Sequence, residues 1–224
     1  KAVVYGLQTS EKTYASFDIS VSNPGGHSSR PRKDNAIYEL ADALRKLSAY
    51  EIPVQSTEQT RASFGFTGKQ LGGDLGKAML RFADNPDDQS AVSVIAADPE
   101  YVGTLRTTCV ATLLKGGHAD NALPQLASAT VNCRIFPGVS VESVRAKIAE
   151  VIDNPKATVK GIGTPYASDA SPMREDVMQA VRKAVDANFA GLPIVPSMSS
   201  GATDSLYFRA AGIPSYGVSG AYVQ

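Results

Sequence analysis

The sequence predicts an α+β fold: a ferredoxin-like unit, with two helices on one face of an antiparallel sheet, followed by a shorter α/β segment. Three segments alternate apolar and polar residues, as half-buried strands do: 14–21, 104–114 and 127–136. Two segments repeat apolar residues at helical spacing: 37–47 and 140–152. A short strand is expected at about 157–162, so the order is strand, helix, strand, strand, helix, strand.

Capping and breaking residues set the boundaries of these elements. The first strand ends at a glycine-rich loop, Gly25–Pro31. Asp34 is expected to cap the first helix, with Pro53 beyond its end, and Ser140 is expected to cap the second. With both helices on one face, the other face is free to meet solvent, a ligand or a second subunit. Edge-to-edge pairing with a second copy would make a symmetric dimer.

The segment 55–103 interrupts this pattern. Five glycines in its first part indicate loops, and a short helix is expected around Lys77–Ala83, ended by Asn85–Asp88. We therefore interpret 55–103 as an insertion with modest structure.

The last part of the chain alternates helix and strand. Ser171 and Pro172 are expected to open a helix, and strands are expected at 192–195 and 213–218. Between them, a loop at 199–204 leads into a short helix from Ser205. This pattern predicts parallel strands in an α/β unit that is too small to close its own core.

Composition excludes several classes of partner. Lys plus Arg and Asp plus Glu both number 22. A neutral chain lacks the basic surface that nucleic acid needs, and no apolar run approaches the roughly 20 residues that span a membrane. Cys109 and Cys133 lie on apolar faces of expected strands, so we predict buried free thiols. A start at Lys1 without a signal peptide suggests part of a longer protein and leaves the compartment open.

His27, one of two histidines, is the first candidate functional residue. A titratable side chain in a loop between a strand and a helix is suited to chemistry, although a surface turn fits these residues equally well. His118, in the connector 116–124, is a weaker candidate, better explained as a hydrogen-bonded loop residue.

Arg134 and Asn121 form a second candidate group. Arg134 lies on the open face of its strand, and an arginine fork with an asparagine amide suits a carboxylate, although a solvated arginine is the simpler reading. The loop 199–204 presents backbone N–H groups to an anion, or Asp204 or Ser205 simply caps the next helix.

Metal and nucleophilic motifs are missing from the sequence. The two histidines lie far apart, without an H-E-x-x-H or H-x-H pattern or a Glu-Glu pair, and no G-x-S-x-G elbow is present. A metal site made from this chain alone is therefore not expected.

Five motifs in this order resemble the co-catalytic zinc peptidases of the aminoacylase, glutamate carboxypeptidase and succinyl-diaminopimelate desuccinylase family: Gly25–Pro31, Asn121–Pro124, Cys133–Gly138, Gly201–Ser205 and Gly212–Gly217. The resemblance runs across most of the chain and is weakest over 55–103.

The resemblance implies three segments: 1–12 as the tail of the first part of a catalytic domain, 13–165 as an inserted lid that dimerises, and 166–224 as the returning part of the catalytic domain. It implies hydrolysis of the amide of a peptide or N-acyl amino acid that has a free carboxylate. By the same resemblance, His27 would donate a hydrogen bond to the oxyanion, often in the partner's active site. Asn121 and Arg134 would hold the substrate carboxylate, and Gly201, Ala202 and Thr203 would form a substrate-binding loop.

The chain departs from this family in its metal ligands. The family's H-x-D motif, bridging aspartate, Glu-Glu pair, further carboxylate and late histidine are not identifiable, and Asp204 does not occupy a ligand position. We therefore expect two Zn²⁺ ions in a full-length parent but none on this chain, which would be inactive alone. The alternative is a non-catalytic dimerisation or ligand-binding module.

Overall fold

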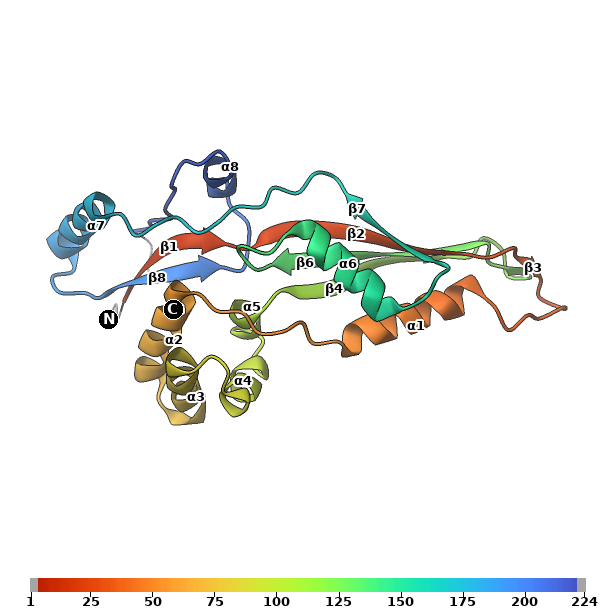
Figure 1. Cartoon of the computed structure of the whole chain (residues 1–224), viewed down its shortest axis with the longest axis horizontal. Coiled ribbons are helices and arrows are strands. Elements are labelled where there is room, and N and C mark those ends of the chain that lie inside the picture. The colour runs from red at the N-terminus through yellow and green to blue at the C-terminus, as the bar shows by residue number, and fades with distance from the viewer. Residues whose placement is uncertain (1–3, 221–224) are drawn as a thin grey trace.

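The computed structural model describes residues 4–220, so the outermost residues of the predicted segments 1–12 and 166–224 lie outside it. Figure 1 shows an elongated molecule built around one long sheet, with a second, small sheet and a group of helices toward one end. The predicted fold class is confirmed. None of the helices in the described part of the chain is long and apolar enough to cross a membrane.

The main sheet has the strand order of a ferredoxin-like fold, β4-β6-β2-β7, with all neighbours antiparallel. Its strands are β2 (Thr13–Ser22), β4 (Thr108–Gly116), β6 (Leu126–Ile135) and β7 (Ala157–Ile162). The pairing of β2 with β6 is unbroken from Thr13 opposite Ile135 to Ser22 opposite Leu126. Alternate residues of both strands are buried, as the sequence pattern predicts.

Helices α1 (Ala36–Ala49) and α6 (Val141–Ile152) pack on one face of this sheet and close its core, in which Phe17, Ile19 and Ile148 are almost fully buried. Ser140 caps α6 as predicted, accepting the Ser143 N–H at 3.0 Å. The predicted cap of α1 is wrong: Asn35 accepts the Ile37 N–H, whereas Asp34 pairs with Arg32.

The predicted insertion is far more ordered than expected. It forms four helices: α2 (Glu58–Leu71), α3 (Gly73–Asp84), α4 (Gln89–Ala96) and α5 (Val102–Leu105). They surround a separate core that contains Phe64, Met79, Phe82 and Ile95.

Two glycines that suggested loops instead let helices touch. A Cβ added to Gly68 of α2 would lie 2.6 Å from the carbonyl oxygen of Gly76 in α3, so only glycine permits this approach. The expected stop after α3 is confirmed, and Asp88 then caps α4 through the Ser90 and Ala91 N–H groups.

The strand expected at 104–114 begins later and is less regular. Residues 102–105 belong to α5, and β4 starts at Thr108. A register shift between Ala111 and Leu113 breaks the inward and outward alternation, so most of β4 is exposed.

A second sheet joins the two ends of the described chain. β1 (Tyr5–Glu11) pairs in parallel with β8 (Ile194–Ser199), as an α/β unit requires. The helix expected from Ser171 begins later, as α7 (Glu175–Asn188), and α8 (Ser205–Ala210) follows β8. The strand expected at 213–218 is reduced to a single bridge between Gly217 and Gln8.

The prediction of free thiols is wrong, because Cys109 and Cys133 form a disulfide. The two residues face each other across β4 and β6, with Cα atoms 4.1 Å apart. Their shared face, which suggested burial, also brings the sulfur atoms within bonding distance once the strands pair.

Replacing both cysteines by alanine is expected to lower the free energy of unfolding by about 2–4 kcal/mol, because the unfolded chain loses a cross-link. Urea titration of the wild type and the Cys109→Ala/Cys133→Ala variant measures this difference. A reductant should lower the free energy of unfolding of the wild type but leave that of the double variant unchanged. Two free thiols in the denatured, unreduced protein would contradict the disulfide.

Candidate functional site

His27 lies at the far tip of the main sheet, beside the connector that carries Asn121. The short strands β3 (Gly26–His27) and β5 (Ala122–Leu123) pair there. The Ser28 N–H also donates to the carbonyl oxygen of Asn121 at 2.9 Å. The structure therefore brings these two predicted site residues together, and both are exposed.

The His27 ring is set to donate from Nε2. The backbone N–H of Ser29 donates to Nδ1 at 3.2 Å, and the Ser29 hydroxyl lies 2.8 Å from the same nitrogen. An N–H donor fixes Nδ1 as an acceptor, so the neutral ring carries its proton on Nε2. Within residues 4–220, Nε2 makes no hydrogen bond and remains available to a ligand.

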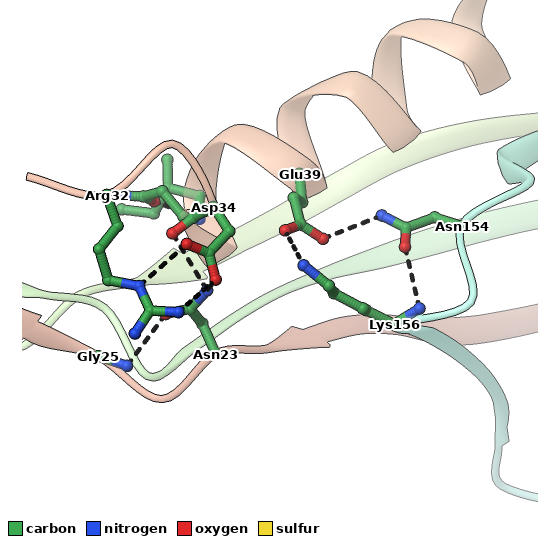
Figure 2. A network of polar contacts seen from close by, with 9 residues as sticks. Asn23, Gly25, Arg32, Asp34, Glu39, Asn154 and Lys156 are labelled. Atoms are coloured by element: carbon green, nitrogen blue, oxygen red, sulfur yellow. Dashed lines mark hydrogen bonds and ion pairs between the residues drawn. The ribbon is translucent and has the colours of Figure 1, made fainter.

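A polar network closes the loop that carries His27 (Figure 2). Asn23 accepts the Gly25 N–H at 3.0 Å and donates to Asp34 at 3.2 Å. Arg32 pairs with Asp34 at 2.8 Å, and this hydrogen-bonded contact lowers the pKa of Asp34 to about 2. The ends of the loop are therefore held together at neutral pH.

The second contact in Figure 2 anchors the neighbouring helix. Glu39 of α1 pairs with Lys156 at 2.8 Å and accepts from Asn154, and the Lys156 hydrogen bond lowers the pKa of Glu39. This contact fixes α1 against the turn before β7. His118 is exposed in the same connector as Asn121, and its role stays a prediction.

Arg134 lies at the opposite end of the sheet. It stands between Tyr14 on β2 and Thr108 on β4, each directly opposite it in the ladder. Its guanidinium lies 4.7 Å from the centre of the Tyr14 ring, a cation–π contact that orients the fork. Arg134 is only half-buried, so a ligand on the open face can reach it.

Lys12, which the sequence analysis missed, adds a second positive charge near Arg134. Its side chain is 0% exposed, and its Nζ makes one long contact, 3.5 Å to Thr108 Oγ1. No carboxylate pairs with it within residues 4–220. Burial, and then the charge of Arg134, lower its pKa to about 8. Lys12 lies between β1 and β2, and no local sequence pattern indicates its burial.

The predicted binding loop is attached to this same end. The buried carboxylate of Glu11 accepts the Thr203 N–H at 2.6 Å and pairs with Arg209 at 2.5 Å. The Lys12 N–H donates to the Ser199 carbonyl oxygen at 3.0 Å. The expected cap is not formed, since Asp204 makes no capping hydrogen bond, and the Ser205 N–H donates to Thr203 instead. Gly201, Ala202 and Thr203 therefore lie near the start of β2.

The candidate residues thus form two groups, which we call the tip site (His27 and Asn121) and the hinge site (Lys12, Arg134 and Gly201–Thr203). Tyr14, opposite Arg134, and Ser22, beside the tip, are eight residues apart on one straight strand. At about 3.3 Å per residue, they are roughly 26 Å apart. One chain does not bring the tip site and the hinge site together.

The described residues do not fit a metal centre. No group of three or more His, Cys, Asp or Glu side chains between positions 4 and 220 is placed to hold an ion.

Comparison with known proteins identifies a family for most of the chain. The profile of the peptidase dimerisation domain, M20_dimer, matches residues 9–160. "Probable carboxypeptidase S-like 2" of Dictyostelium discoideum is 27% identical over 88% of this chain and 38% of its own length. The human "N-fatty-acyl-amino acid synthase/hydrolase PM20D1" is 27% identical over 90% of this chain and 41% of its own. The chain thus spans about two fifths of these relatives.

Solved structures show the same fold at lower identity. An "M20 family metallo-carboxypeptidase" from Sulfolobus solfataricus matches 96% of this chain and 52% of its own, with a TM-score of 0.60 and 15% identity. The aminopeptidase PepT from Bacillus cereus matches all of this chain and 48% of its own, with a TM-score of 0.59 and 13% identity.

The stability of the protein is expected to rise between about pH 8 and pH 10.5. Lys12 has a folded pKa of about 8, below its ordinary 10.5, so the unfolded chain binds more protons over that window. A shift of this size corresponds to roughly 3 kcal/mol, and Lys12→Met should remove the rise. Urea titrations at pH 7 and pH 10 measure it. Lys115→Met, at an exposed lysine, is the control, and an unchanged pH dependence in Lys12→Met would refute the assignment.

Proposed function

Because the chain belongs to the M20 peptidase dimerisation-domain family, we propose that it supplies the lid and substrate-binding loop of a metal-dependent amidohydrolase. Its substrate would be a peptide or N-acyl amino acid with a free carboxylate. The observation that carries this proposal is the hinge site, where Lys12 and Arg134 lie close to the loop that contains Thr203.

The division into lid and catalytic parts follows the strand pairing. We assign 13–165, with the insertion 55–103, to the lid, and 1–12 with 166–224 to the catalytic domain. In support, β1 pairs with β8 and not with the main sheet. The two segments that flank the lid in sequence thus share a sheet of their own.

Arg134 would bind the substrate carboxylate. Tyr14 holds its guanidinium in place, and a planar fork suits the two carboxylate oxygens. Lys12 is buried, so it would attract the bound carboxylate through its positive charge at a distance and not by direct contact. The backbone of Gly201, Ala202 and Thr203, fixed by Glu11, would orient the amide beside it.

The exposed edge of the main sheet suits pairing with a second subunit. β4 is an edge strand, and three of its apolar side chains are largely exposed: Val110 (58%), Leu113 (60%) and Leu114 (70%). Ile37, which is exposed and lies beside Gly116, extends this apolar surface onto α1. An open edge with such side chains favours strand pairing across a symmetric dimer.

Such a dimer would bring the two sites together. If β4 pairs antiparallel with its copy, the Gly116 end of one strand lies opposite the Thr108 end of the other. The tip of each lid then approaches the hinge site of its partner. His27 of the partner subunit would donate Nε2–H to the oxyanion that forms on the substrate amide, with Asn121 beside it.

The metal would be held outside residues 4–220. We propose two Zn²⁺ ions in the full-length enzyme, and no hydrolysis by this chain alone. No step above requires a metal ligand from the described residues.

Arg134→Ala in the full-length enzyme is expected to raise KM for an N-acyl amino acid by roughly 10- to 100-fold, because a charge-assisted carboxylate contact is lost. The same change should leave KM for the corresponding C-terminal amide almost unaltered. Steady-state kinetics on both substrates measure the difference, with Lys183→Ala, at an exposed lysine on α7, as the control. Equal effects on acid and amide would exclude a carboxylate clamp. A wild type that dimerises but hydrolyses neither substrate would indicate a non-catalytic module.

Mixed dimers test whether His27 acts on the partner's substrate. His27→Ala alone should lower kcat by about 10²–10³-fold, as the loss of an oxyanion donor does. Co-expressing His27→Ala and Arg134→Ala subunits should restore roughly a quarter of wild-type activity, since half the dimers are mixed and each has one intact site. No recovery in purified mixed dimers would place both residues in the same subunit's site.

A further inference from the structure

The insertion helices and β8 enclose a cleft next to the hinge site. Its volume is about 730 Å³, and its walls come from α2 and the residues around α5 on one side and from β8 with Ser200 on the other. Figure 1 shows α2 beside the small sheet of β1 and β8. The cleft therefore lies between the proposed lid and the proposed catalytic part, where a substrate would enter.

The lining of this cleft is rich in unused hydroxyl groups. Eight of its eleven residues carry a hydroxyl. The Thr60 hydroxyl accepts the Thr57 N–H in the cap of α2, and the Ser199 hydroxyl accepts the Gly201 N–H. Within residues 4–220, the other six make no hydrogen bond through their hydroxyls: Ser63, Thr67, Tyr101, Thr104, Ser197 and Ser200.

The cleft is continuous with the predicted binding loop. Ser199 and Ser200 line it and lead directly into Gly201. At Gly103, next to the cleft, an added Cβ would lie 3.6 Å from Ser200 and 3.9 Å from Lys12 Nζ. A substrate whose carboxylate lies on Arg134 would thus have this cleft beside it.

We propose that the cleft binds the acyl side of the substrate and selects a peptidyl group over a fatty acyl chain. This inference rests on the proposed function and identifies the class of acyl group. A hydroxyl both donates and accepts a hydrogen bond, so the six free hydroxyls can pair with the N–H and C=O groups of a peptide. An alkyl chain would displace water from the same hydroxyls without replacing those bonds.

Substrate length and polarity provide the test in the full-length enzyme. The probes share one C-terminal amino acid and differ in the acyl group: acetyl, glycylglycyl or octanoyl. For the wild type, kcat/KM should be higher for the glycylglycyl than for the octanoyl substrate. The Ser63→Ala/Thr67→Val variant, which removes two hydroxyls with little change of shape, should lower the glycylglycyl value roughly tenfold and leave the acetyl value unchanged.

A steric variant checks the position of the acyl group independently. Thr67→Trp should exclude the glycylglycyl substrate while the acetyl substrate is still cleaved, which also shows that the variant folds. Ser93→Ala, on α4 and outside the cleft, is the control. Preference of the wild type for octanoyl, or equal effects of both cleft variants on all three substrates, would overturn the cleft assignment alone. A wild type that cleaves none of them would overturn the proposed function, and the assignment with it.

Discussion

The unbroken pairing of β2 with β6 determines where every candidate residue lies. Its ten residue pairs keep the two central strands straight and in register, and two helices pack over their buried side chains. At one end, this ladder aligns Tyr14, Arg134 and Thr108 in a row. At the other, it supports the loop of His27. Because a paired strand does not shorten or fold back, the tip and the hinge sites stay apart, and a second subunit is the simplest way to unite them.

A buried ion pair between Glu11 at the end of β1 and Arg209 of α8 lies next to the start of this sheet. The side chains of Glu11 and Arg209 are 1–2% exposed, and Glu11 also accepts the Thr203 N–H. Removing either partner would leave a buried charge unpaired, which is costly, so the contact fixes the binding loop relative to the first residue of β2. One oxygen of Glu11 serves the cation and the other serves the loop backbone. The geometry of the proposed carboxylate site thus depends on a residue that would not itself touch substrate.

The sequence pattern predicts the ferredoxin-like strands and helices because their apolar residues face one continuous core. It fails where the structural role of a residue depends on the residues that it packs against. Gly68 and Gly76 suggested loops, yet they are the contact of two crossing helices. Cys109 and Cys133 suggested burial on one face, but only the register of β4 against β6 makes them a disulfide.

Some residues of the candidate site could be predicted from the sequence and others could not. His27, Asn121, Arg134 and the loop Gly201–Thr203 stand out by residue type and by family resemblance, and their roles stay predictions. Lys12 has no motif: its burial arises from the junction of β1, β2 and α5, which no local pattern contains. The distance between the tip site and the hinge site likewise follows only from the length and register of the strands.

The insertion shields the hinge site in a way that the ferredoxin-like unit alone does not. Gly103 of α5 lies next to Lys12 Nζ, so without α2 to α5 Lys12 would be closer to solvent and its charge would be more strongly screened by water. With them, the charge is retained in a protected position and a hydroxyl-lined cleft is created beside the binding loop. In the proposed enzyme, recognition of the carboxylate and the acyl group therefore belongs to one subunit, while oxyanion stabilisation comes from the other. Changes in α2 can then alter substrate choice without disturbing the loop that holds His27, because the two lie at opposite ends of a rigid sheet.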